Sequence, residues 1–221
     1  MALLDHTNRS LEGRRQSLYE LINNWDQPAR CRTYYNFTGS TIISDLWQKN
    51  TIGGGASDCT FTTDDSIDGG MKVATSNSAS SPSASFTMNE KKQFNGFGCT
   101  FVGNMKKGDD NLAIKYGLAD DSTVTPPVCI LMCEGNLHSY KGIETNNESR
   151  TDSTVAKSTD YFGFKLECFT SNVACTINGV RAITKTTSIP NNIMQPYAYI
   201  QSRTTSAVKQ WNTTFFEAYN T

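Results

Sequence analysis

The sequence predicts an all-β protein, an antiparallel β-sandwich preceded by a short N-terminal α-helical arm. Two observations support this. From about residue 31 onward, apolar and polar residues alternate over short runs, which is the period of a half-buried strand. Before that point, apolar residues recur every seven positions, which is the spacing of one helical face. We therefore divide the chain into an arm, residues 1–30, and a sandwich domain, residues 31–221.

The arm is predicted to be one amphipathic helix. Its apolar face comprises Leu4, Leu11, Leu18 and Trp25 at seven-residue intervals, with Leu21 and Ile22 beside them. Gly13 interrupts this face and Pro28 ends it. Two interpretations stay open: the helix packs on its own domain, or it docks on a partner or bundles with further copies of the chain.

The strands follow in chain order. Alternating runs are found at 84–88, 97–101, 112–116, 162–168, 173–177 and 180–184, with further strands at 197–201 and 213–219. Polar stretches predict loops at 62–70, 75–83, 104–111, 119–127 and 144–160. Asn178-Gly179 separates two alternating runs and predicts a two-residue hairpin, because both residues tolerate positive φ. Many short strands with regular turns indicate a sandwich.

Charge and cysteine content exclude several classes of protein. Lys and Arg number 20 against 21 Asp and Glu, a net charge of -1, so neither nucleic acid nor an anionic membrane is an expected partner. The first residues reach charge without an apolar run, so we expect no cleaved export signal. Seven cysteines are an odd number without metal-ligand spacing, and we expect free, buried thiols in a protein made in a reducing compartment.

No cofactor or metal is predicted. The segment Asp64-Asp65-Ser66-Ile67-Asp68-Gly69 copies the first half of a calcium loop, but Thr75 stands where the closing Glu would fall. We interpret it as a turn, since Asp and Gly are favoured in turns for backbone reasons alone.

The final third of the chain carries a family resemblance. It runs through YFGFKLE (161–167), NVACTINGV (172–180), TSIP (187–190), MQPY (194–197) and FFEAY (215–219). This resembles the C-terminal half of concanavalin A-like lectin/glucanase domains, in the variant found in phage, archaeal-virus and environmental structural proteins. The resemblance covers about residues 31–221 and implies a jelly-roll sandwich with either sugar binding or glycoside hydrolysis.

Hydrolysis would require a pair of carboxyl groups. The resembling hydrolases carry them on a strand with the pattern Glu-x-Asp-x-x-Glu, which no glutamate of this chain begins. Glu144 and Glu148 flank Asn-Asn in an expected loop, where their spacing would not be fixed. We therefore expect no catalytic residues and no enzyme.

Sugar binding would require aromatic rings and planar polar side chains on the concave sheet. The candidates by residue type and position are Tyr116, Tyr140, Arg150, Tyr199, Arg203 and Trp211. For each of them, a place in the core or on the solvated surface is the simpler interpretation.

Taken together, these patterns favour a non-catalytic structural protein of a virion, as a capsid, decoration or fibre component made in the host cytoplasm. Its expected partners are further copies of itself or other particle proteins, held through the arm, and a cell-surface glycan. The alternative is an extracellular carbohydrate-binding module or a glycoside hydrolase relative that acts on polysaccharide.

Overall fold

The computed structural model describes residues 32–36, 47–53, 59–63, 71–75, 82–88, 93–108, 111–135, 137–147, 149–203 and 209–221. All of them belong to one compact unit, Arg32–Thr221. The predicted arm and the Asp64–Gly69 segment lie outside the described residues, so their assignments stay predictions.

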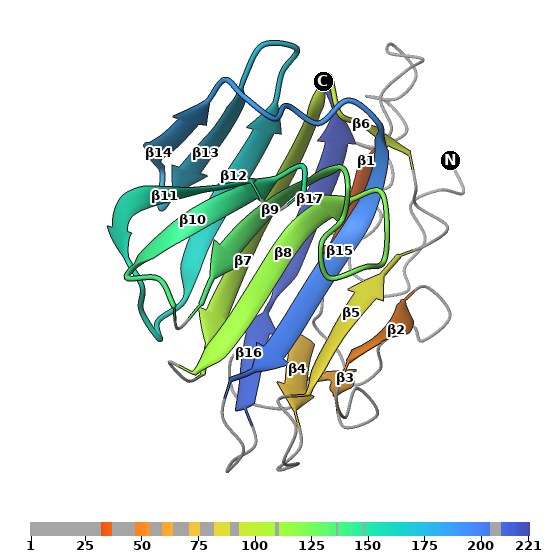
Figure 1. Ribbon diagram of the computed structural model, residues 1–221, viewed down its shortest axis with the longest axis vertical. Helices are drawn as coiled ribbons and strands as arrows, with labels where there is room; N and C mark the ends of the chain where they lie inside the picture. Colours follow the sequence, from red (N-terminus) through yellow and green to blue (C-terminus); the bar gives the residue numbers. More distant parts are fainter. Residues whose placement is uncertain are drawn as a thin grey trace, which may run out of the picture. The chain divides into compact units, whose positions relative to one another are not determined.

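The described residues form two antiparallel sheets (Figure 1). The nine-stranded sheet contains β1 (Arg32–Asn36), β3 (Thr60–Thr63), β4 (Met71–Thr75), β7 (Cys99–Lys107), β12 (Phe162–Cys168), β13 (Val173–Ile177), β14 (Val180–Lys185), β16 (Lys209–Thr213) and β17 (Phe215–Asn220). The eight-stranded sheet contains β2 (Gln48–Gly53), β5 (Ser83–Thr87), β6 (Phe94–Asn95), β8 (Leu112–Ala119), β9 (Cys129–Glu134), β10 (Tyr140–Thr145), β11 (Ser149–Ala156) and β15 (Ile193–Ser202).

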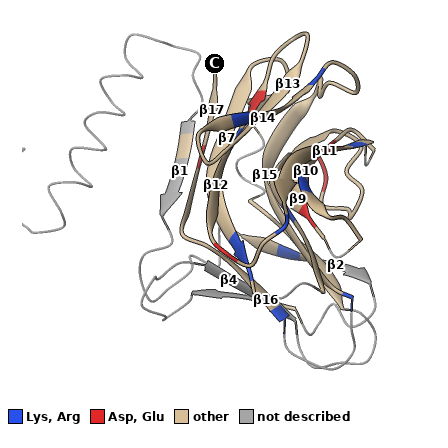
Figure 2. Ribbon diagram, turned by 90° about the vertical axis from the view of Figure 1, so that its left-hand side faces the viewer, with Lys and Arg blue, Asp and Glu red and all other residues tan. Residues whose placement is uncertain are grey.

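The two sheets pack face to face as a sandwich, seen edge-on in Figure 2. The eight-stranded sheet has the order β11-β10-β9-β8-β15-β5-β2, with β6 paired to β15. The nine-stranded sheet has the order β14-β13-β12-β7-β16-β4-β3, and β17 joins β7 to β1. Strands distant in sequence are thus neighbours, as β8 and β15 are. The predicted all-β sandwich is confirmed.

Aromatic rings fill the space between the sheets. Phe101 on β7 stacks with Phe216 on β17, with ring centroids 5.6 Å apart and planes 5° apart. Tyr116 on β8 meets Phe101 edge to face at 5.1 Å, and Trp211 on β16 lies 5.1 Å from Tyr116. The hydrophobic effect and ring packing of such side chains hold the two sheets together.

The predicted hairpin is confirmed. Ile177 pairs with Val180, and the two residues between them have positive φ, 48° at Asn178 and 82° at Gly179. The Asn178 side chain also accepts a hydrogen bond from the backbone N–H of Gly163, at 3.0 Å, which ties the turn to β12.

Two predicted loops are wrong in part. Residues 149–156, within the expected loop 144–160, form β11. This strand lies at the edge of its sheet and carries little apolar alternation, so its sequence gives no strand period. The expected loop 104–111 begins late, because β7 continues to Lys107.

The cysteine prediction is confirmed for the six described residues, which are all buried thiols: Cys59, Cys99, Cys129, Cys133, Cys168 and Cys175. Within the described part of the chain, no three His, Cys, Asp or Glu side chains come together as metal ligands. None of the described residues forms a helix with the length and apolarity that a membrane crossing requires.

Candidate functional site

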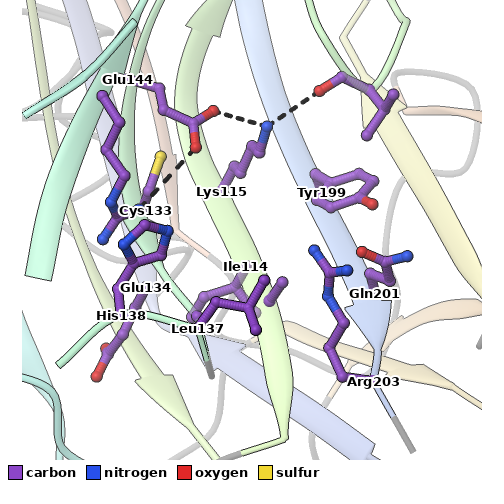
Figure 3. Close-up of a pocket in the computed structure, with 14 residues that line it drawn as sticks. Ile114, Lys115, Cys133, Glu134, Leu137, His138, Glu144, Tyr199, Gln201 and Arg203 are labelled. Atoms are coloured by element: carbon purple, nitrogen blue, oxygen red, sulfur yellow. Dashed lines mark hydrogen bonds and ion pairs between the residues drawn. The ribbon is translucent and has the colours of Figure 1, made fainter. Parts of the chain in front are cut away.

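The candidate site is a hollow of about 330 Å³ over β8, β9, β10 and β15 (Figure 3). It lies on the face of the eight-stranded sheet that points away from the core, here called the outer face. The lining residues are Ala113, Ile114, Lys115, Val124, Cys133, Glu134, Gly135, Leu137, His138, Glu144, Arg150, Tyr199, Gln201 and Arg203. The volume falls at the small end of ligand pockets, which span roughly 300–1,000 Å³.

Strand alternation decides which side chains reach the outer face. On β8, Ile114 and Tyr116 belong to the core between the sheets, so Lys115 between them points outward. On β15, Ala198 and Ile200 belong to the core, so Tyr199 points outward as well. The register pairs Lys115 with Tyr199, and the Lys115 ammonium lies 5.5 Å from the centre of the Tyr199 ring.

Lys115 and Glu144 form the central ion pair of the site. Glu144 stands on β10, and its Oε2 lies 2.6 Å from Nζ of Lys115. The same ammonium donates to the backbone oxygen of Val124 at 3.1 Å. Both interactions are drawn in Figure 3. The side chains are only 10% and 12% exposed, so this pair is more strongly coupled than an ion pair in open water.

Arg150 and Asp152 extend this charge network onto the edge strand β11. Nε of Arg150 donates to Oδ1 of Asp152 at 2.7 Å, and Nη1 lies 4.0 Å from Oε1 of Glu144. A Cβ added at Gly142 would lie 2.8 Å from Oδ1 of Asp152 and 3.0 Å from Nη2 of Arg150. The glycine therefore lets this pair lie close across β10. His138 adds a ring nitrogen 3.7 Å from Oδ2 of Asp152.

The loop between β8 and β9 covers one end of the outer face, here called the β8–β9 loop and defined as residues 120–128. Figure 1 shows it crossing in front of β15. The Tyr197 hydroxyl donates to the Thr123 oxygen at 2.8 Å, and the Ser85 hydroxyl donates to the Ser122 oxygen. Val124 packs against a buried cluster that includes Tyr197 and Tyr199. The hollow is what remains open beside this loop.

Cys133 lines the hollow as a neutral thiol. Burial raises the pKa of Cys133 well above its usual range. Thiolates, not thiols, are the nucleophiles, so this residue is not poised for nucleophilic chemistry.

Glu134 lines the hollow too, but its carboxyl group turns inward. Its Oε1 lies 3.6 Å from Nζ of Lys107 and 3.6 Å from Nζ of Lys141, and it accepts the backbone N–H of Ser158 at 2.7 Å. Burial lowers the pKa of Lys141. This group of charges joins the two sheets and is structural.

The six sugar-binding candidates separate into two groups. Arg150, Tyr199 and Arg203 line the hollow, although the Tyr199 side chain is only 3% exposed. Tyr116 and Trp211 are fully buried between the sheets, so neither ring is open to a ligand. Tyr140 is exposed at the start of β10 but does not line the hollow.

Several polar residues of the site were not predicted as candidates, among them Lys115, His138, Glu144 and Gln201. For Lys115 and Gln201 a signal was present, because each alternates with apolar residues on its strand and must face outward. The sequence predicts a loop at Glu144, but this residue lies on β10. His138 stands in a short loop with no such pattern.

Comparisons with known proteins identify the fold. No protein-family model and no curated protein sequence matches the chain. Among solved structures, the carbohydrate recognition domain of Emp47p matches with a TM-score of 0.58 and 9% identity, over 88% of this chain and 96% of that one. A Bacillus licheniformis β-glucanase matches with a TM-score of 0.59 and 15% identity, over 86% and 98%. The fold is the concanavalin A-like jelly roll.

A third similar structure belongs to an enzyme as well. A glycoside hydrolase family 16 endo-glucanase from Bacteroides ovatus matches with a TM-score of 0.58 and 10% identity, over 83% of this chain and 98% of that one. At these identities the likeness shows the fold alone.

These comparisons correct two expectations. The predicted virion component finds no support among the similar structures, which are mainly glucanases together with a lectin domain. The expectation that the protein is not an enzyme is contradicted by the same glucanases. The resemblance to the concanavalin A-like fold is confirmed, whereas its viral context and the particle partners are unsupported. The location in a virion stays a prediction.

Proposed function

We propose that the protein binds a saccharide in the hollow on the outer face. The observation that carries the proposal is the set of planar polar side chains gathered in one hollow, those of Glu144, Arg150, Gln201 and Arg203. A sugar ring presents neighbouring hydroxyl groups that both donate and accept. Carboxylate, guanidinium and amide groups match such hydroxyls, because their two heteroatoms lie in one plane.

The hollow also offers apolar surface for the C–H face of a sugar. Leu137 is 73% exposed at the rim and supplies most of this surface, because Tyr199, which lines the hollow beneath the Lys115 ammonium, is only 3% exposed. A pocket with apolar walls and a few convergent polar groups is typical of small-ligand sites. The carbohydrate recognition domain and the glucanases of the same fold support a saccharide as the ligand.

Isothermal titration calorimetry with a panel of oligosaccharides, both neutral and acidic, tests the proposal. We expect at least one member to bind, and Gln201→Ala to weaken that binding by about tenfold, since one or two hydrogen bonds are lost. The matched control is Gln210→Ala on β16 of the other sheet, which should bind as the parent protein does. A panel in which no oligosaccharide binds would overturn the proposal, and so would equal affinities of parent and Gln201→Ala.

Glycoside hydrolysis is a second candidate, favoured by two neighbouring carboxyl groups, that of Glu144 in the hollow and that of Asp152 beside it. Glu144 pairs with Arg150 across β10 and β11, and Asp152 lies one step diagonally from it, opposite Gly142. Hydrolysis needs two carboxyl groups that flank the scissile bond. Both contact the Arg150 guanidinium, within 4.0 Å for Glu144 and at 2.7 Å for Asp152.

Release of reducing ends from any oligosaccharide that binds tests hydrolysis. We expect Glu144→Gln and Asp152→Asn each to lower the rate by at least about a hundredfold if the two carboxyl groups do the chemistry. A rate that survives in both variants, or no release at all, would rule this candidate out and leave the binding proposal standing.

A further inference from the structure

The cations around the hollow differ in how they are neutralised. Lys115 has the Glu144 carboxylate at 2.6 Å, and Arg150 has the Asp152 carboxylate at 2.7 Å. Arg203 also lines the hollow, but no described carboxylate pairs with its guanidinium. Among the described residues, the hollow therefore contains one positive charge without a carboxylate partner.

The fold holds Arg203 toward the hollow. Its backbone N–H donates to the Asn111 oxygen at 2.9 Å, which continues the pairing of β15 with β8 by one residue. Arg203 thus keeps the alternation of Tyr199 and Gln201 and shares their face. Figure 3 shows its guanidinium directed into the hollow beside the Gln201 amide.

Small residues leave room in front of this pair. Gln201 is opposite Ala113 in the register of β15 and β8. Gly135 follows β9, and a Cβ added there would first meet Ala113, at 3.7 Å. No large side chain of these neighbours fills the space beside Gln201 and Arg203.

We propose that the bound saccharide is acidic, and that Arg203 with Gln201 recognises the carboxylate of a hexuronic acid residue. This inference rests on the proposed function and names its ligand class. A guanidinium binds a planar carboxylate through two parallel hydrogen bonds, and the neighbouring amide can hold an adjacent ring hydroxyl. The remaining hydroxyls then face Glu144 and Arg150.

A general attraction for polyanions does not account for such binding. The whole chain has a net charge of -1, so it has no overall field that gathers anions. The preference must come from the local, unbalanced charge of Arg203, and removing that one charge should remove it.

The experiment compares three ligands on the full-length protein by calorimetry: a galacturonate oligosaccharide, its methyl ester, and a sulfated galactose oligosaccharide. The ester keeps the sugar and removes the charge. We expect the galacturonate to bind at least about tenfold more tightly than its ester, as a charge-assisted hydrogen bond predicts. Arg203→Gln should bring the ratio of the two affinities close to one.

The matched control is Arg181→Gln, which removes the same charge from β14 in the other sheet, where Arg181 lies beside Glu167. It should leave the ratio unchanged. Equal binding of galacturonate and ester would overturn the acidic-ligand inference while the proposed function stands. Tighter binding of the sulfated sugar than of the galacturonate would overturn the carboxylate as the recognised group. Binding of no saccharide would mean that the proposed function itself fails.

Discussion

Lys107 and Glu134 lie opposite each other across the sandwich, with Nζ 3.6 Å from Oε1 and no exposed surface on either side chain. Lys107 comes from β7 and Glu134 from β9, so the pair joins the two sheets. Lys141 approaches the same oxygen from β10, also at 3.6 Å. One carboxylate therefore serves two buried ammonium groups.

The first prediction concerns this carboxylate. Glu134→Ala should lower the free energy of unfolding by about 3–5 kcal/mol, because two buried ammonium groups lose the carboxylate that they share. Urea unfolding followed by tryptophan fluorescence measures it. The control is Glu167→Ala, which removes ion pairs with the exposed Lys165 and Arg181 and should cost less than about 1 kcal/mol. Equal losses in the two variants would contradict the structural role of Glu134.

The second prediction concerns the turn at Gly179. A Cβ added there meets no atom within 4 Å, so only the φ of 82° opposes a side chain. Gly179→Val should therefore cost about 1–3 kcal/mol, the range for strained backbone. Gly163→Val is the control, since Gly163 has the same open space without a positive φ. If both variants have the same melting temperature as the parent protein, the turn does not require glycine.

The third prediction is a pH dependence of stability. Burial raises the pKa of Cys129 and of Cys175 to about 12. In the unfolded chain a thiol ionises near pH 8.5, so above that pH the unfolded state binds fewer protons and stability falls as pH rises. The loss should reach about 2 kcal/mol for each thiol by pH 10.

Urea unfolding at pH 7.5 and pH 10 checks this. Cys175→Ala should lose less stability over this interval than the parent protein, whatever its stability at pH 7.5. An identical loss in both proteins would show that Cys175 does not contribute to the pH dependence.

The fourth prediction concerns thiol reactivity. The six described cysteines are buried thiols, so a thiol reagent should label few of them in the native protein. After denaturation without reductant, all six should react. Cys99 and Cys168 are the most informative pair, because they are directly opposed on β7 and β12. Two unreactive thiols after denaturation would indicate a disulfide at this position.

The sequence was sufficient for the strands whose two faces differ. Residues 162–168 alternate strictly, and the structure places Phe164 and Leu166 in the core as the period requires. Edge strand β11 buries few side chains on either face, so its sequence lacks the apolar–polar alternation that predicts a strand. The hairpin at Asn178-Gly179 was predictable because turn chemistry is local.

The site was less accessible to sequence reasoning. Tyr116 shares a strand face with Leu112 and Ile114, which indicates the core, whereas Tyr199 shares a face with Tyr197 and Gln201, which indicates the outer face. These patterns separate the two tyrosines. They do not reveal that Lys115 and Glu144 meet, because that depends on the order of strands β8, β9 and β10 in the sheet.

The β8–β9 loop limits which part of a saccharide chain can reach the proposed site. Its hydrogen bonds from Tyr197 and Lys115 hold it across the outer face, so the hollow is blocked on that side. A polymer of the proposed saccharide cannot continue past the loop in that direction, so a chain aligned with it places a terminus in the hollow. Binding capacity should then follow the number of chain termini in a sample rather than its total sugar mass, and shortening a polysaccharide at constant mass should increase it.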